Sequence, residues 1–188
     1  MVAPMADPTD IQRRIGDLVR EGTVVSVDLN AGTARVEFAD ELATGDIPWI
    51  AGRAGSTRSW SPPAIGEQVV VLAPEADTAR GMIIGSLSSD AHPHPANDAS
   101  TLTAFEDGAT VSYDPKAHSL MAYLPADATV FVFAGGGLHF TGDLTVDGDV
   151  HATGTVTGDA DVVGSGKSLK GHVHTKVQAG AAISGPPQ

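Results

Sequence analysis

The sequence predicts an all-β protein, in which an N-terminal OB-fold barrel is followed by an intertwined trimeric β-helix shaft with a metal-bound tip. Three observations support this fold class. Short segments rich in β-branched residues, separated by turn signals, fill residues 22–89. Residues 138–164 alternate almost strictly between apolar or glycine positions and polar positions. Two histidines, His172 and His174, are separated by a single residue near the end of the chain.

The composition limits the functions open to this chain. It has 188 residues, with 23 acidic side chains against 11 basic ones and a formal net charge of −12. A negative surface repels nucleic-acid phosphates and anionic lipid headgroups, so we expect no nucleic-acid partner and no electrostatic binding to membranes. The absence of cysteine excludes disulfides and thiolate metal sites. No apolar run approaches the roughly 20 residues that span a bilayer, and the N-terminus lacks a signal-peptide layout, so we expect a soluble protein made in a cytoplasm.

Residues 1–21 are expected to hold a short helix, from Asp7 to Glu21. Asp7 or Thr9 can cap it, and apolar residues recur on one face at helical spacing, namely Ile11, Ile15, Leu18 and Val19. Gly22 is expected to end the helix. Two placements stay open: the helix packs on its own domain, or it docks on a neighbouring subunit or a larger hub.

Residues 22–89 are expected to form the OB-fold base. Five short strands in about 65 residues suit a small closed barrel of this type. The expected strands are Thr23–Val27, Thr33–Phe38, Asp46–Ile50, Gln68–Ala73 and Gly81–Ser86. Residues 28–32 (DLNAG) predict a hairpin turn, because Asn and Gly accept positive φ.

OB barrels often bind single-stranded nucleic acid through aromatic platforms in a basic groove. In this chain only the loop Gly52–Gly66, with Arg53, Arg58 and Trp60, offers such residues. We therefore expect the barrel to serve as a mounting base.

Residues 90–98 (DAHPHPAND) are expected to be a linker, because prolines favour extended backbone and the polar side chains bury little. His92 and His94 have the spacing of a ligand pair, but a proline follows each of them. We expect both to be solvated, with metal binding as the alternative.

Residues 99–166 are expected to form the shaft. Two β-like stretches, Thr101–Tyr113 and Ser119–Leu124, flank an expected turn at 114–118 (DPKAH), and a third stretch covers Thr129–Ala134. From 138 to 164 every even position is apolar or glycine, and the odd positions before Val163 are polar. A large apolar residue recurs every six positions, at Leu138, Leu144, Val150, Val156 and Val162.

Extended chain with one buried face explains this period of two. A single straight strand of that length would reach roughly 90 Å, far beyond ordinary strands, so the run must fold back in hairpins or wind with partner chains. The alternation continues through each glycine, and one chain has too few large side chains to close a core. We favour three chains wound about one axis, with the even-numbered residues facing it; a monomeric meander is the alternative.

Residues 167–188 are expected to form the tip. His172 and His174 lie in a segment that looks extended, so both imidazoles would point to one side. In a trimer six imidazole nitrogens would then surround one axis. Six nitrogens favour an octahedral ion, and since zinc prefers four ligands, iron or nickel fits better. The Gly- and Pro-containing residues 179–188 are expected to wrap back over the tip.

Several linked segments resemble one known family. They are GTVVSVDLNAGTARVEF at 22–38, IPWIAGRAGSTRSWSPPAIGEQVVVLAP at 47–74, SDAHP at 89–93, FEDGATVSYDPKAHSL at 105–120 and SLKGHVHT at 168–175. In this order they resemble phage baseplate assembly protein V, the membrane-piercing central spike of contractile-tailed phages. The resemblance covers nearly the whole chain. It implies an OB-fold base, a trimeric β-helix, and a tip where His172 and His174 of each chain hold one iron ion.

The resemblance also implies a structural role in the virion, at the tip of the tail baseplate. The homotrimer would bind tail hub and baseplate proteins, close the tail tube, and be driven through the bacterial outer membrane when the sheath contracts. The resemblance carries over no catalytic residue, so we do not expect this protein to be an enzyme.

Two alternative functions stay open. A non-haem iron enzyme would combine the two histidines with an aspartate, but the sequence gives no sign of a substrate pocket; the candidates are Asp143, Asp147, Asp149 and Asp159. A tail fibre or host-binding adhesin would favour exposed aromatic side chains, and the odd-numbered shaft positions have none.

Overall fold

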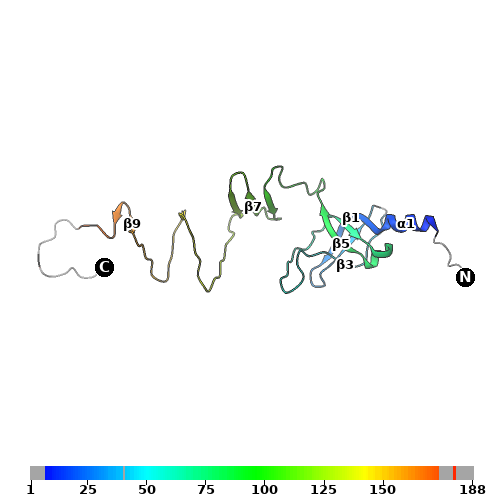
Figure 1. Ribbon diagram of the computed structural model, residues 1–188, viewed down its shortest axis with the longest axis horizontal. Helices are drawn as coiled ribbons and strands as arrows, with labels where there is room; N and C mark the ends of the chain where they lie inside the picture. Colours follow the sequence, from blue (N-terminus) through cyan, green and yellow to red (C-terminus); the bar gives the residue numbers. More distant parts are fainter. Residues whose placement is uncertain (1–6, 40, 174–179, 181–188) are drawn as a thin grey trace. The chain divides into compact units, whose positions relative to one another are not determined.

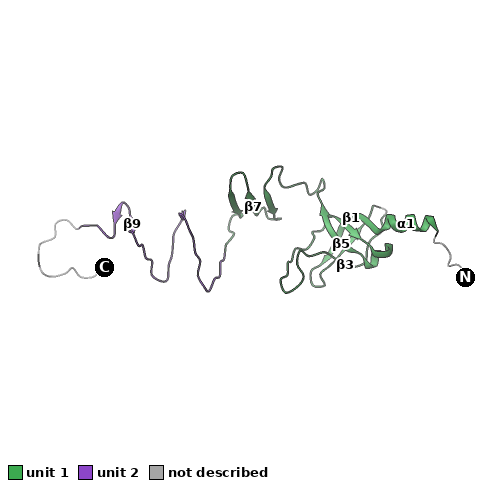
Figure 2. Cartoon of the chain, viewed as in Figure 1, with its two compact units in different colours: residues 1–130 green, residues 131–188 purple. Residues whose placement is uncertain are grey.

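The computed structural model describes residues 7–39, 41–173 and 180. The chain divides into two compact units, Met1–Val130 and Phe131–Gln188 (Figure 2). In the part that the structure describes, the regular elements are mainly β-strands, with one α-helix and two short 3-10 helices (Figure 1). The mainly β fold class is therefore confirmed. None of the helices in these residues has the length and apolar character needed to cross a membrane.

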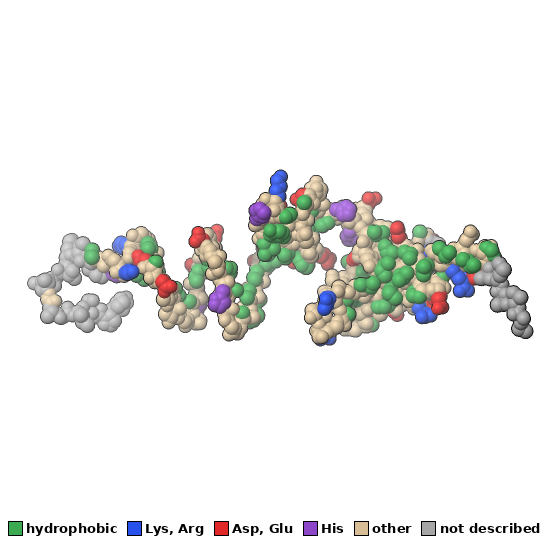
Figure 3. All heavy atoms as spheres, in the orientation of Figure 1, with side chains coloured by type: hydrophobic (Ala, Val, Ile, Leu, Met, Phe, Trp, Pro, Cys, Tyr) green, Lys and Arg blue, Asp and Glu red, His purple; other side chains and the backbone are tan. Residues whose placement is uncertain are grey.

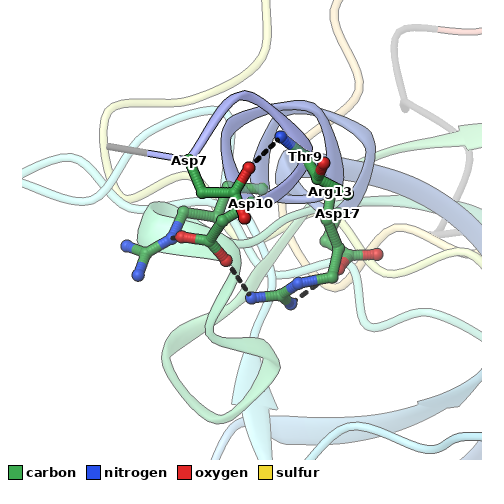
Figure 4. Close-up of polar contacts among 6 residues, drawn as sticks. Asp7, Thr9, Asp10, Arg13 and Asp17 are labelled. Carbon is green, nitrogen blue, oxygen red and sulfur yellow. Dashed lines mark hydrogen bonds and ion pairs between the residues drawn. The ribbon is translucent and has the colours of Figure 1, made fainter. Parts of the chain in front are cut away.

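Helix α1 spans Pro8–Leu18 and begins where the sequence predicts. The Asp7 carboxylate caps it by accepting a hydrogen bond from the Thr9 backbone N–H at 3.0 Å (Figure 4). Pro8 fits the first turn, because no helical hydrogen bond is needed from that position.

The polar face of α1 carries a small charge network. Asp10 pairs with Arg13 at 2.9 Å, and Arg13 also reaches Asp17 (Figure 4). Asp10 pairs with Arg14 as well, at 2.8 Å. Hydrogen bonds from Arg13 and Arg14 lower the pKa of Asp10, because they favour its charged form. The apolar stripe is uncovered: no residue of α1 is buried, although the helix contacts the 3-10 helix η1, Pro74–Ala76.

The helix ends earlier than the sequence predicts, and Gly22 does not end it. Strand β1 (Val19–Asp28) starts at once, with Val19 opposite Leu72 and Gly22 opposite Val69. Residues 19–21 are extended because cross-strand pairing and packing outweigh helix propensity. Gly22 has a packing role instead: a Cβ there would lie 2.5 Å from Val36 Cγ1 and 2.6 Å from the Glu37 carbonyl oxygen.

This close approach yields a first prediction. We expect Gly22→Ala to lower the free energy of unfolding by about 1–3 kcal/mol, the usual range for overpacking. Gly85→Ala in β5 is the matched control, since a Cβ there meets no atom within 4 Å. Both variants restrict the unfolded chain alike, so the difference between their urea midpoints isolates the clash. Equal midpoints would contradict the packing role of Gly22.

All five expected strands of the base are present, and they form one antiparallel sheet in the order β3-β2-β1-β4-β5. Besides β1, the strands are β2 Thr33–Glu37, β3 Ile47–Pro48, β4 Gln68–Leu72 and β5 Met82–Leu87. Only two residues of the expected third strand pair as strand. The predicted hairpin turn is confirmed: the Asp28 carboxylate accepts from the backbone of Asn30 and Ala31, and Gly32 has a φ of 69°.

The sheet curls until its two edges meet, as expected of an OB barrel. The residue after β3, Trp49, forms a parallel bridge with Ile83 of β5, and the Ile50 N–H donates to the Ile83 carbonyl at 2.9 Å. Inside lies one apolar core, which contains Val24, Ala34, Val36, Phe38, Ile47, Val69, Val71 and Ile83. The buried Thr44 hydroxyl is satisfied, because it accepts from the Val36 N–H and donates to the Gly45 carbonyl.

The second sheet of unit 1 has the order β6-β7-β8, with β6 Thr101–Ala104, β7 Thr110–Asp114 and β8 Ser119–Tyr123. The expected single stretch Thr101–Tyr113 is therefore wrong. It is broken by a turn in which the Asp107 carboxylate accepts from the Ala109 N–H and Gly108 has a φ of 86°. The expected turn at 114–118 is confirmed, with the Asp114 carboxylate accepting from the Lys116 and Ala117 backbone.

Unit 2 contains little regular structure in a single copy. The predicted stretch Thr129–Ala134 is not a strand, and residues 138–162 contain none (Figure 1). Two short strands follow, β9 Val163–Gly164 and β10 Lys167–Ser168, and they pair as a hairpin. Hairpins within one chain therefore do not account for the alternation of apolar and polar residues in this region.

Candidate shaft face and metal tip

The large apolar residues at even-numbered positions between 138 and 162, which the sequence predicts to share one face, are exposed in the structure. Val150 is 76% exposed and Leu138 is 62% exposed, far above the values for core residues. The same face, here called the even face, also exposes Phe140, Leu144, Val146, Val156 and Val162. Figure 3 shows hydrophobic side chains at the surface of this unit beside acidic ones. A soluble protein rarely leaves so many large apolar side chains in water, so this face is suited to an interface.

The backbone of the same segment also has no hydrogen-bond partners among the described residues of one copy. No backbone–backbone hydrogen bond joins residues 138–161 to any other residue that the structure describes. Gly142 and Gly148 have φ values of 117° and 143°, which only glycine adopts readily. The segment is thus bent at glycines, and its N–H and C=O groups remain available for pairing with other strands.

A compact hairpin precedes the predicted metal ligands. The turn between β9 and β10 uses Ser165 and Gly166, with φ values of 48° and 76°. The Leu169 N–H closes the hairpin on the Val162 carbonyl at 2.9 Å. The Asp161 carboxylate accepts from the Val162 N–H at 2.8 Å and from the Lys170 N–H at 3.2 Å.

Asp161 is held in its charged form by these contacts. Hydrogen bonds from the Ser168 side chain and then from the Lys170 backbone lower the pKa of Asp161 below its usual range. Because the folded-state pKa is depressed, the contribution to stability is present above the unfolded pKa. It is lost only as the pH falls through the lower folded value. At neutral pH the carboxylate is therefore a full acceptor.

His172 is placed directly by this hairpin. Its backbone N–H donates to the Ser168 carbonyl at 3.1 Å, and its Nδ1 lies 3.1 Å from the Leu169 carbonyl oxygen. A carbonyl only accepts, so Nδ1 carries a proton, and in the neutral imidazole Nε2 is then the nitrogen with the lone pair. Histidines that bind metals commonly donate the other ring N–H to a carbonyl or carboxylate in this way. His172 thus fits the role of a ligand through Nε2, whereas His174 lies outside the described residues.

One copy does not assemble a metal site in the part of the chain described. No group of three or more His, Asp or Glu side chains there is placed to hold an ion. The aspartates of the enzyme hypothesis, Asp143, Asp147, Asp149 and Asp159, are exposed, and they form no such group. A site that uses His172 therefore needs ligands from His174 or from other copies.

The other predicted candidates lie elsewhere. In the linker, a turn joins Ser89 and His92 through backbone hydrogen bonds, and the Ser88 hydroxyl lies 2.9 Å from His94 Nδ1. In the loop 52–66, the ring centroid of Trp60 lies 5.3 Å from that of Trp49, with the planes tilted by 59°. Trp60 is thus engaged with its own domain on one side.

Sequence reasoning missed Asp161 and Ser168. In the sequence Asp161 is one of the polar odd-numbered positions of residues 138–164, and Ser168 is a polar residue shortly before the two histidines. An Asp eight residues before a Leu-Lys-Gly-His stretch is a weak signal, because the contact depends on how tightly the intervening hairpin turns.

Comparisons with known proteins agree with the fold. Residues 20–87 match the family described as the Type VI secretion system/phage-baseplate injector OB domain. The chain is also similar to the spike protein of Escherichia phage P2, with 32% identity over 117 residues. That alignment covers 62% of this chain and 55% of the relative, so the chain spans about half the length of the curated relative it matches.

Proposed function

We propose that three copies of this chain form the central spike of a contractile tail. This proposal is supported by the match of residues 20–87 to the injector OB domain family and by the similarity to a phage spike protein. The predicted resemblance to the baseplate family is confirmed by these similarities. In the proposed assembly the OB domains form the base, and residues 99–166 of three chains wind into a β-helix shaft.

The observation that carries this proposal is the even face. One chain leaves both its large apolar side chains and its backbone hydrogen-bonding groups between 138 and 161 without partners among the described residues. Three chains about one axis provide partners for the side chains and for the backbone. The apolar residues turn inward and pack together, while the backbones of adjacent strands form hydrogen bonds. The Asp- and Thr-rich odd positions then face water, which keeps the shaft soluble.

At the tip, His172 and His174 from each chain would hold one iron ion with six imidazole nitrogens. Imidazole is a suitable ligand for iron, and the ion would cross-link three chain ends into one rigid point. The protonated Nδ1 of His172 leaves Nε2 as its ligand atom. The ion would have a structural role and no catalytic one.

The proposed role is mechanical. The trimer binds hub and baseplate proteins at the end of the tail, caps the tail tube, and pierces the bacterial outer membrane when the sheath contracts. Such a role needs a stiff shaft and a fixed point rather than a substrate pocket, and we assign no catalytic residue.

Native mass spectrometry with elemental analysis tests the assembly. We expect a species of about 57 kDa, three times the chain mass of 19.1 kDa, that persists at micromolar concentration. Since all six imidazoles converge on one ion, we expect close to one iron per three chains. A monomer would contradict the shaft, whereas one ion per chain, or none after iron-replete expression, would contradict the shared site.

A further inference from the structure

A hairpin leads from the predicted shaft to His172, and the Asp161 carboxylate lies at its start. We call Asp161, Ser168 and the Leu169 carbonyl the tip buckle. Asp161 Oδ1 accepts from the Lys170 N–H, nine residues further along the chain, and from the adjacent Val162 N–H. The strands inside this loop pair Val163 with Ser168. A single carboxylate oxygen therefore ties the two ends of the hairpin together.

Two residues of the tip buckle, Ser168 and Leu169, contact His172 directly. The Ser168 carbonyl accepts the His172 backbone N–H, and the Leu169 carbonyl accepts the Nδ1 proton. Ser168 Oγ accepts the Gly171 N–H at 2.8 Å, which holds the residue just before the histidine. The acceptors that orient His172 thus belong to residues whose own position depends on Asp161.

We propose that Asp161 is the positioning residue of the tip: it fixes the hairpin so that the Leu169 carbonyl holds His172 in the Nδ1–H form before an ion binds. This inference rests on the proposed function for its purpose, but the tautomer it assigns is a property of the metal-free protein. Pre-orienting a ligand lowers the entropy lost on binding, so the buckle strengthens metal affinity without touching the metal.

The test compares three variants of the full chain. Asp161→Ala removes the acceptor, and Asp161→Asn keeps an oxygen that can accept the same backbone N–H groups. Asp159→Ala removes a neighbouring exposed carboxylate and serves as the control. Native mass first shows that all three have the oligomeric state of the wild type, so that a tip effect is separated from a failure to assemble.

The first readout is the ¹⁵N NMR spectrum of the His172 imidazole in metal-free protein, which distinguishes the two neutral tautomers. We expect the Nδ1–H form in the wild type, Asp161→Asn and Asp159→Ala, and a mixture in Asp161→Ala. A wild-type Nε2–H form, or an unchanged Nδ1–H form in Asp161→Ala, would overturn the proposal.

The second readout is Fe²⁺ affinity, measured by competition with a chelator in the absence of oxygen. We expect Asp161→Ala to bind about 10- to 100-fold more weakly, the usual effect of removing an outer partner of a ligand, and Asp161→Asn to stay close to wild type. Wild-type affinity in Asp161→Ala would overturn the positioning role. A wild type that binds no Fe²⁺ but shows the Asp161-dependent tautomer would contradict the proposed iron site while supporting the positioning of His172.

Discussion

The Val150→Asp variant is expected to lose the trimer, while Thr153→Asp assembles like the wild type. Val150 lies on the even face, where three copies would meet near the axis. Each valine contributes about 1.5–3 kcal/mol when buried, and the variant also places three unpaired carboxylates in a desolvated layer. We expect a total loss of several kcal/mol per trimer, on the scale of these terms. Native mass and thermal melting at matched concentration measure it.

If the protein remained a single chain, the Val150→Asp and Thr153→Asp variants would not differ in stability. Val150 and Thr153 are both exposed in one chain, and neither lies in a strand. A monomeric meander would therefore tolerate both substitutions equally. If the two variants matched in mass and melting temperature, the assignment of even-numbered residues to an axis would be wrong.

The double variant His172→Ala with His174→Ala is expected to lose the iron and keep the trimer. The two substitutions remove every proposed imidazole ligand, so the metal content should fall from about one ion per trimer to zero. The trimer should survive because the even face spans residues 138–162, whereas the ion ties only the last residues. Elemental analysis and native mass on the same sample separate the two effects.

Acid provides an independent check on this site. Ligand imidazoles must be deprotonated, so protons compete with the ion and the wild type should release iron on acidification. The double variant should show no such release, and both proteins should remain trimeric through the same pH step. Dissociation of the wild-type trimer together with the iron would contradict the separation of shaft and tip.

Local patterns in the sequence predicted much of the base correctly. The cap at Asp7, the turn at 28–32 and the five strands follow from short-range chemistry, in which side chains act on their own backbone. One error, the break of the expected stretch Thr101–Tyr113, comes from a local turn at Asp107 and Gly108, whereas another depends on a contact between distant residues. The helix ends at Leu18 because Val19 pairs with Leu72, and this pairing competes with a helical pattern that looks continuous in the sequence.

The sequence by itself determined the alternation of residues 138–164 and the spacing of the two histidines, because a period of two depends only on the extended backbone. Tertiary structure decided which groups have partners. It showed that Gly22 lies against Val36 and Glu37, that the even face has no cover within one described copy, and that Asp161 reaches Lys170 across a hairpin. Such contacts depend on how the chain folds back on itself, and residue order alone does not specify that return path.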